Sequence, residues 1–129
     1  MIATWKLGCV GVNINPMYKN AELSHILKDS SPKVIISLAD IYKECILPLN
    51  VDIYSIIFFA TDYLHTNAIT KYKIIFGNEN NKNFEIQESE KISYFQSLIN
   101  KYRKYKHEES DFSHHLAPSD IAFLTYTSG

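Results

Sequence analysis

Short apolar runs alternate with amphipathic segments along the first half of the chain. The runs occupy residues 9–14, 33–38 and 54–60, and a continuous run of strand-forming residues is typical of a strand that is covered on both faces. Since the segments between the runs are long enough to form helices, we expect the three strands to pair in parallel within one sheet. The pattern therefore predicts an α/β fold that contains part of a doubly wound parallel sheet.

Residues with strong positional preferences mark the ends of the helices in this region. Gly8 supplies a left-handed cap for the first helix. Asn20 is a good N-cap for the next helix, and Pro32 limits that helix because proline disfavours helical angles in the residue before it. A further helix is predicted over residues 40–47 and ends at Pro48.

The second half of the chain has a weaker pattern. Residues 62–90 are polar and rich in asparagine, and a short strand is predicted over residues 71–76. Apolar residues then recur every three or four positions, which predicts a helix from Ser93, as its N-cap, to about Lys104. Residues 121–126 form the last predicted strand.

The composition excludes several classes of function. A formal net charge of -1 gives no general attraction to nucleic acid or to anionic lipid. No apolar run is long enough to span a membrane, and the N-terminus lacks the basic and apolar regions of an export signal. We therefore expect no nucleic-acid partner, no membrane span and a cytoplasmic location. Cys9 and Cys45 lie in apolar stretches, and we expect small buried thiols rather than a disulfide or a metal site.

The sharpest chemical signal follows the last predicted strand, which leads directly into Thr127, Ser128 and Gly129. A polyphosphate needs several N–H and O–H donors that converge on it without bulky side chains in the way. Hydroxyl residues and glycine meet both needs. Taken alone, the three residues are also compatible with an ordinary turn after a strand.

The same residues resemble part of a known signature loop. Tyr126-Thr127-Ser128-Gly129 resembles the opening of the loop of the AMP-forming adenylating enzymes, the superfamily of acyl-CoA ligases, luciferases and peptide-synthetase adenylation domains. That loop reads Tyr-Thr-Ser-Gly-Thr-Thr-Gly-x-Pro-Lys-Gly, and the preceding residues 118–122 strengthen the match. Residues 5–18 resemble the family segment in which a helix ends, a strand follows and an Asn-Pro turn closes it. The resemblance covers about residues 1–61 and 117–129.

The resemblance implies an enzyme that activates a carboxylic acid with ATP. In the family, acid and ATP give an acyl-adenylate and pyrophosphate, Mg assists, and an acceptor thiol, commonly CoA, takes the acyl group. Thr127, Ser128 and Gly129 would contact the ATP phosphates, while no catalytic residue and no metal ligand can be placed on this chain. We expect residues 1–129 to be an interior slice of the large N-terminal region, truncated at both ends, and to be inactive alone.

Three interpretations of the whole chain stay open. The segments 13–18 and 22–27 look closer to fatty-acid and aryl-acid CoA ligases than to the adenylation domain of a peptide synthetase, which tends to carry Leu-Asp-Pro at the turn. We therefore favour a fragment of an acyl-CoA ligase over that alternative. A non-catalytic flavodoxin-like α/β binding module is the alternative from a different class. The acid substrate cannot be assigned from these residues.

Two polar clusters near residue 100 have simpler explanations than a ligand site. The first holds the cations Lys101, Arg103, Lys104 and Lys106. We interpret it as the solvated C-terminus of a helix, because acidic residues follow at once and cancel the field. The second holds ligand-type side chains, at His107, Glu108, Asp111, His114 and His115. Their spacing fits no tight metal template, and we interpret the segment as a polar linker.

Overall fold

The computed structural model describes residues 2–60, 62, 86–105 and 116–127. These residues form two compact units. Unit 1 combines the two ends of the chain, Met1–Ser31 and Arg103–Gly129, and unit 2 is the segment Pro32–Tyr102 between them. The sequence predicts an α/β fold with parallel strands, and both units confirm it.

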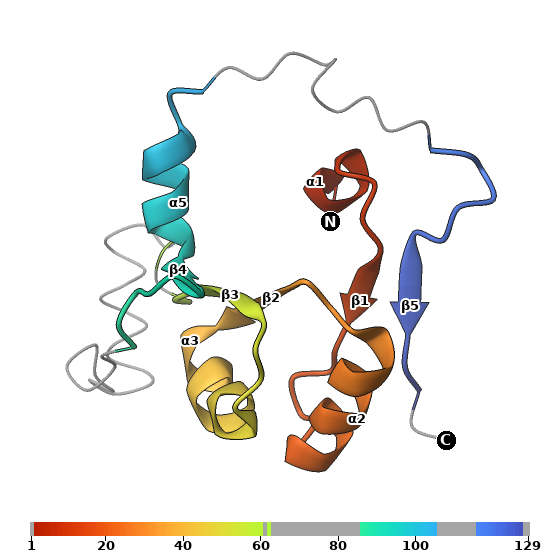
Figure 1. The fold of residues 1–129 in the computed structure, drawn as a ribbon, viewed down its shortest axis with the longest axis horizontal. Helices are drawn as coiled ribbons and strands as arrows, with labels where there is room; N and C mark the ends of the chain where they lie inside the picture. The colour runs from red at the N-terminus through yellow and green to blue at the C-terminus, as the bar shows by residue number, and fades with distance from the viewer. Residues whose placement is uncertain (1, 61, 63–85, 106–115, 128–129) are drawn as a thin grey trace. The chain divides into compact units, whose positions relative to one another are not determined.

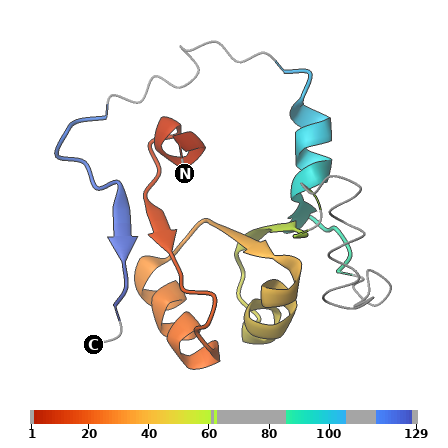
Figure 2. The ribbon, with the colours of Figure 1, turned by 180° about the vertical axis from the view of Figure 1, so that it is seen from behind.

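Unit 1 consists of helices and a pair of parallel strands that lie side by side in both ribbon views (Figures 1 and 2). Its described elements are α1 (Ile2–Lys6), β1 (Gly11–Asn13), α2 (Asn20–Ser30) and β5 (Phe123–Thr125). The predicted cap after the first helix is confirmed, because Gly8 adopts a φ of 66°.

Helix α2 has clear start and stop signals, and its N-cap differs from the predicted one by one residue. Lys19 is the N-cap, and its backbone N–H donates to the Glu22 carboxylate at 3.1 Å, so that Asn20 is instead the first helical residue. The helix ends at Ser30, and Ser31 follows in the left-handed region with a φ of 44°. The predicted stop before Pro32 is therefore confirmed.

Unit 2 is built on a three-stranded parallel sheet in the order β2-β3-β4. Its described elements are β2 (Val34–Leu38), α3 (Ala39–Ile41), the π-helical η1 (Tyr42–Ile46), the 3-10 helix η2 (Leu47–Leu49), β3 (Tyr54–Phe58), β4 (Ile92–Tyr94) and α5 (Phe95–Tyr102). The side chain of Ile57 at the centre of β3 is 0% exposed. Burial of Ile35, Ala39 and Tyr42 extends this core from β2 into the following helical segment.

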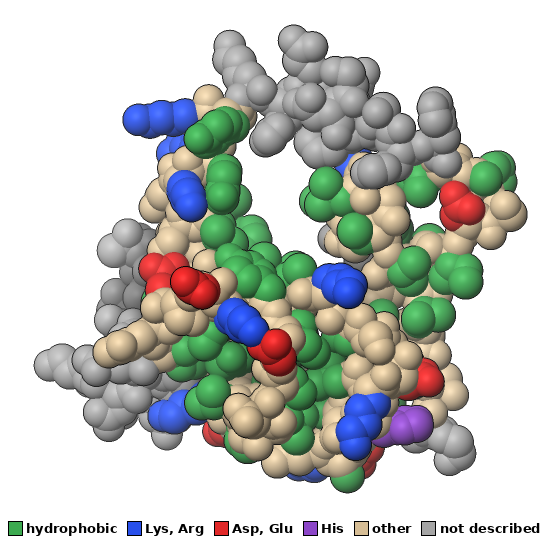
Figure 3. All heavy atoms as spheres, in the orientation of Figure 1, with side chains coloured by type: hydrophobic (Ala, Val, Ile, Leu, Met, Phe, Trp, Pro, Cys, Tyr) green, Lys and Arg blue, Asp and Glu red, His purple; other side chains and the backbone are tan. Residues whose placement is uncertain are grey.

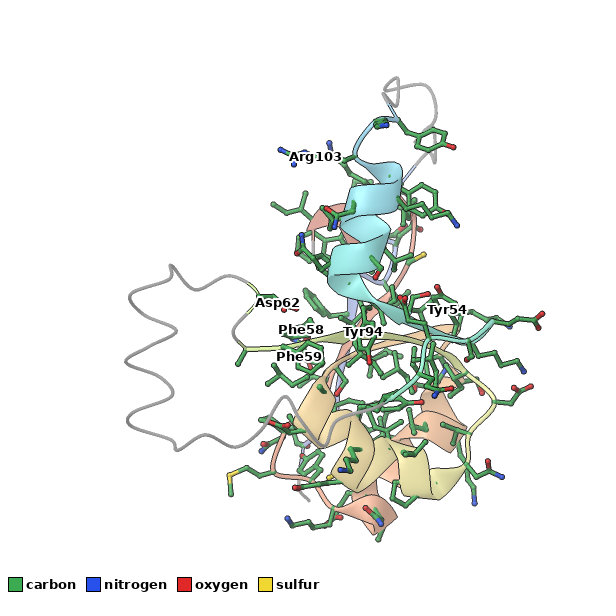
Figure 4. The ribbon with its side chains drawn as sticks, turned by 90° about the vertical axis from the view of Figure 1, so that its left-hand side faces the viewer. Tyr54, Phe58, Phe59, Asp62, Tyr94 and Arg103 are labelled. Carbon is green, nitrogen blue, oxygen red and sulfur yellow. The ribbon has the colours of Figure 1, made fainter. Side chains whose placement is uncertain are left out.

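Aromatic and hydroxyl contacts connect β3, and Phe59 just after it, to β4; Figure 4 labels Tyr54, Phe59 and Tyr94. The rings of Phe59 and Tyr94 lie 5.6 Å apart, and the hydroxyls of Tyr54 and Ser93 share a hydrogen bond of 2.6 Å. Ser93 is therefore a strand residue and not the predicted N-cap of a helix, which begins at Phe95. Pairing with Ile56 on β3 overrides the local preference of serine for a cap.

The structure corrects two further predictions. Strands 9–14, 33–38 and 54–60 were expected in one sheet, but β1 pairs with β5, while β2 and β3 belong to the other described sheet. The helical segment after β2 also continues through Pro48 and ends at Leu49, and the following Asn50 is its cap with a φ of 48°. Proline is tolerated there because it lies in the first turn of η2, where its missing N–H has no helical acceptor.

The apolar run of β2 is covered on one face only among the described residues. Ile35 and Ser37 are buried, whereas Val34 and Ile36 are 45% and 59% exposed. The prediction that this strand is covered on both faces is therefore wrong for the described structure. The predicted strand at 71–76 lies outside the described residues.

Candidate functional site

The candidate site lies where the parallel strands β1 and β5 end. Gly11, Val12 and Asn13 pair with Phe123, Leu124 and Thr125, respectively. Because the two strands run in the same direction, the segments that follow them leave the same edge of the sheet. In open parallel sheets, ligands bind outside this carboxyl edge. The chemical groups of residues 14–18 and of Tyr126 and Thr127 therefore lie at the same edge.

The segment after β1 is a hydrogen-bonded turn. The Asn15 carbonyl accepts from the Tyr18 N–H at 3.0 Å, and the Asn15 side-chain Oδ1 accepts from the Met17 N–H at 3.0 Å. Pro16 between them has the fixed φ that suits the second position of such a turn. The turn closes the strand at the point where the sequence predicts, and it directs the Tyr18 side chain toward β5.

The start of β5 is held by Trp5 and by a short turn. The Trp5 indole N–H donates to the Ala122 carbonyl at 3.2 Å, and its ring meets that of Phe123 edge-on, with centroids 5.2 Å apart. Just upstream, the Asp120 carboxylate accepts from the Ala117 N–H at 2.8 Å. The chain therefore enters β5 in a defined direction. Trp5 is therefore a packing residue of unit 1.

Tyr126 joins the end of β5 to two other segments of unit 1. Its hydroxyl donates to Asp29 Oδ2 at 2.5 Å, and its carbonyl accepts from the Tyr18 hydroxyl at 3.5 Å. The hydrogen bond to Asp29 raises the pKa of the Tyr126 phenol above its ordinary value of 10.0, with desolvation and the carboxylate charge acting in the same direction. A smaller opposing effect on this pKa comes from Ser30.

The structure describes one of the three predicted phosphate-binding residues. Thr127 follows Tyr126 at the carboxyl edge and is exposed. Ser128 and Gly129 lie outside the described residues. The assignment of all three residues to ATP phosphates stays a prediction.

Sequence reasoning missed Asp29 and Tyr18 as neighbours of this edge. Both are far from Tyr126 along the chain, and no local pattern links them. One weak signal was present for Asp29, because a carboxylate near the C-terminus of a helix faces the negative end of the helix dipole. Because a carboxylate is unfavourable at this position of the helix, its presence indicates an interaction with a residue outside the helix.

The other predicted clusters involve the end of α5 and residues outside the described ranges. Lys101, Arg103 and Lys104 are exposed around the C-terminal end of α5, where cations are visible in Figure 3, and Lys101 lies over the Tyr102 ring at 5.2 Å. The remaining residues of the two clusters, Lys106, His107, Glu108, Asp111, His114 and His115, lie outside the described residues. Within the described ranges, no group of three or more His, Cys, Asp or Glu residues could hold a metal ion.

The cysteines correct one minor prediction. Both are free thiols, but Cys9 is exposed and Cys45 is only partly buried, so that the expected burial is wrong for Cys9. In the described part of the chain, no helix is long and apolar enough to cross a membrane.

Comparison with known proteins gives one match. A family model described as AMP-binding enzyme matches the chain over residues 1–129. No curated protein and no solved structure shows significant similarity to the chain. The match extends across both units and includes the carboxyl edge of the β1–β5 pair.

Proposed function

The chain belongs to the AMP-binding enzyme family, within the superfamily of AMP-forming adenylating enzymes, and we propose that it forms part of a ligase that converts a carboxylic acid into its CoA thioester. In this proposal, residues 1–129 correspond to a segment of the large N-terminal region of such an enzyme. Membership of the family implies ATP, Mg and an acid as reactants. The transfer to CoA is the further step that we propose.

One structural observation supports the proposal in addition to family membership. The parallel pairing of β5 with β1 places Tyr126 and Thr127 at the edge of the sheet where ligands of parallel α/β folds bind. These two residues of the loop sequence lie at the edge where a phosphate-binding loop is expected. This agreement between motif and position favours a catalytic role over a non-catalytic binding module.

The proposed reaction has two balanced steps. A carboxylate oxygen of the acid attacks the α-phosphorus of ATP and pyrophosphate leaves, which gives the acyl-adenylate. The CoA sulfur then attacks the acyl carbon, AMP leaves, and the thiol proton is released to solvent. We assign to Thr127, Ser128 and Gly129 the binding of the ATP phosphates through hydroxyl and backbone N–H donors. Such donors stabilise phosphate charge without chemical change of their own.

The turn after β1 favours CoA over a carrier-bound acceptor. It reads Asn15-Pro16-Met17-Tyr18, which resembles the turn of acyl-CoA ligases, whereas peptide-synthetase adenylation domains tend to carry Leu-Asp-Pro. The side-chain oxygen and the backbone carbonyl of Asn15 accept the two hydrogen bonds of this turn. An adenylation domain of a peptide synthetase is the second candidate.

Product analysis of the intact ligase tests the proposal. The enzyme is given Mg-ATP, CoA and a panel of fatty and aryl acids, and the nucleotide and thioester products are separated by chromatography. We expect AMP, pyrophosphate and an acyl-CoA in equal amounts. Formation of ADP and phosphate would overturn adenylate formation. Acyl transfer to a phosphopantetheinylated carrier protein, with CoA unused, would instead support the peptide-synthetase candidate.

The polypeptide of residues 1–129 is expected to be inactive by itself. It carries four residues of the loop and lacks the lysine and glycines that follow in the family. Each charge-assisted hydrogen bond contributes about 1.5–3 kcal/mol, and the loss of about three such contacts costs on the order of 5–9 kcal/mol. Titration calorimetry that shows saturable, sub-millimolar Mg-ATP binding to this polypeptide would contradict that expectation.

A further inference from the structure

Tyr126 is fixed through both its side chain and its backbone. The hydroxyl donates to Asp29 on α2, and the carbonyl accepts from Tyr18 in the turn after β1. These two contacts connect the end of β5 to two segments of unit 1, the turn after β1 and α2, that are distant from it in sequence. They meet at the residue directly before Thr127, where β5 has just ended. The direction in which the chain leaves β5 is therefore set by Asp29 and Tyr18.

The position of Asp29 is not explained by the stability of its own helix. It occupies the last turn of α2, where a carboxylate opposes the negative end of the helix dipole. Alanine at the same exposed position would be a better helix former. The contact that Asp29 makes outside its helix is the hydrogen bond from Tyr126 at 2.5 Å. We therefore look for the role of Asp29 in its contact with the end of β5.

Asp29 is not itself suited to bind a phosphate. Its carboxylate and a polyphosphate are both anions, and they repel one another at close range. Any favourable effect of Asp29 on the binding of a phosphate therefore passes through Tyr126. The raised pKa of the Tyr126 phenol agrees with a neutral donor that holds the carboxylate at this position.

We propose that Asp29 is a positioning residue of the phosphate-binding loop: it holds the Tyr126 hydroxyl while Tyr18 holds the Tyr126 carbonyl, and together they aim Thr127 at the ligand. The inference rests on the proposed function. Strand β5 has only three residues, so that its pairing with β1 supplies few backbone hydrogen bonds. Binding groups must be held within about 0.5 Å of their productive position. The anchor at Tyr126 supplies the order that so short a strand lacks.

The first test measures order at the end of β5 in the purified chain. Amide hydrogen exchange of Tyr126 and Thr127 is followed by NMR in the wild type and in Asp29→Ala, Tyr126→Phe and the double variant. We expect each single variant to exchange about tenfold faster at these amides, which is the size expected for losing one hydrogen bond to a charged acceptor. The double variant should be no faster than either single variant, because both remove the same contact.

Two matched controls separate this effect from a general loss of structure. Asp40→Ala removes an exposed carboxylate in unit 2, and Tyr54→Phe removes a tyrosine hydrogen bond there. Neither should alter exchange at Thr127. A purely helical role for Asp29 predicts slower exchange in Asp29→Ala, because the helix becomes more favourable. Unchanged or slower exchange at Tyr126 and Thr127 in Asp29→Ala would overturn the proposal.

The second test uses the intact ligase and separates ATP binding from acid binding. We expect Asp29→Ala to raise the KM for Mg-ATP by about tenfold and to leave the KM for the acid unchanged. Removal of a negative charge alone would lower the KM for ATP. The direction in which the KM for ATP changes therefore distinguishes a positioning role of Asp29 from a purely electrostatic effect of its charge. Asp29→Asn, which keeps a neutral acceptor for the Tyr126 hydroxyl, should show an intermediate KM.

The two tests fail independently. An intact protein without adenylating activity would overturn the proposed function, while the exchange measurement would still decide whether Asp29 orders the end of β5. An unchanged KM for ATP in an active Asp29→Ala enzyme would overturn the positioning role and leave the proposed function standing.

Discussion

The two described sheets are both parallel, but they are stabilised in different ways. The β2-β3-β4 sheet has five-residue strands at β2 and β3, and its central residue Ile57 is fully buried. The β1–β5 pair has three-residue strands and depends on side chains outside the strands, chiefly Trp5 at its start and Tyr126 at its end. The first sheet is held by burial and the second by individual contacts.

This difference implies different consequences for variants in the two units. An apolar core supplies stability through the area that it removes from water. A strand pair held by a few directed contacts leaves its carboxyl edge open, where Thr127 is exposed. The contrast implies that variants in unit 2 should mainly change stability. Variants at the ends of β5 should mainly change local order and ligand binding.

The largest expected effect is at the centre of unit 2. Ile57→Ala should lower the free energy of unfolding of this unit by about 2–5 kcal/mol, because it removes buried methyl groups and leaves a cavity. Urea denaturation followed by circular dichroism measures the change. The matched control Ile36→Ala, at a side chain that is 59% exposed, should change stability by less than about 0.5 kcal/mol. Equal effects of the two variants would contradict the account of the core.

The next effect is at the start of β5. Trp5→Leu removes the hydrogen bond to Ala122 and the edge-on contact with Phe123, and should destabilise unit 1 by about 1–3 kcal/mol. Trp5→Phe keeps an aromatic ring and should therefore destabilise unit 1 less than Trp5→Leu does. Amide hydrogen exchange at Phe123 measures the local effect, with exchange at Ile57 as the control in unit 2. Faster exchange in unit 2 with no change at Phe123 would contradict the assignment of Trp5 to the stability of β5.

A pH-dependent effect is expected at the end of β5. Because the pKa of Tyr126 is raised in the folded chain, the protonated phenol stabilises unit 1 below pH 10. This stabilisation is lost as the pH rises through the raised pKa, since the ionised phenol can no longer donate to Asp29. Tyr126→Phe should therefore be less stable than the wild type at pH 8, and the difference should vanish in strong alkali. A difference that does not change with pH would contradict this role of the hydrogen bond.

The smallest effect on stability is expected on the exposed face of β2. Ile36→Lys should change the free energy of unfolding by less than about 0.5 kcal/mol, because the side chain is already largely in water. It should nevertheless reduce self-association, since a charge interrupts the exposed apolar face formed with Val34. Analytical ultracentrifugation over a range of concentrations measures this. Unchanged association in Ile36→Lys would show that this face does not mediate it.

The same contrast explains how much of the fold could be predicted from the sequence. Strands β2 and β3 are visible as continuous apolar runs, and the ends of α1 and α2 follow from Gly8 and Pro32. The pairing of β1 with β5 is not visible, because it joins residues from opposite ends of the chain. The cap preference of Ser93 was overridden by pairing with β3.

The candidate site was predictable in its sequence but not in its surroundings. Tyr126 and Thr127 could be identified from the family's loop sequence, and the last strand was expected just before them. The contacts of Tyr126 with Asp29 and Tyr18 could not be identified, since hydrogen bonds between distant side chains leave no periodic pattern. The roles of Thr127, Ser128 and Gly129 in ATP binding stay a prediction.

The most direct test of the central claim is the exchange of labelled pyrophosphate into ATP by the intact ligase. The account predicts exchange that requires both Mg-ATP and a carboxylic acid. It also predicts a loss of about tenfold to a hundredfold in Thr127→Val, which removes one donor to a charged phosphate, and no loss in Thr125→Val. Absence of acid-dependent exchange with a broad panel of acids, or equal exchange in the two variants, would contradict it.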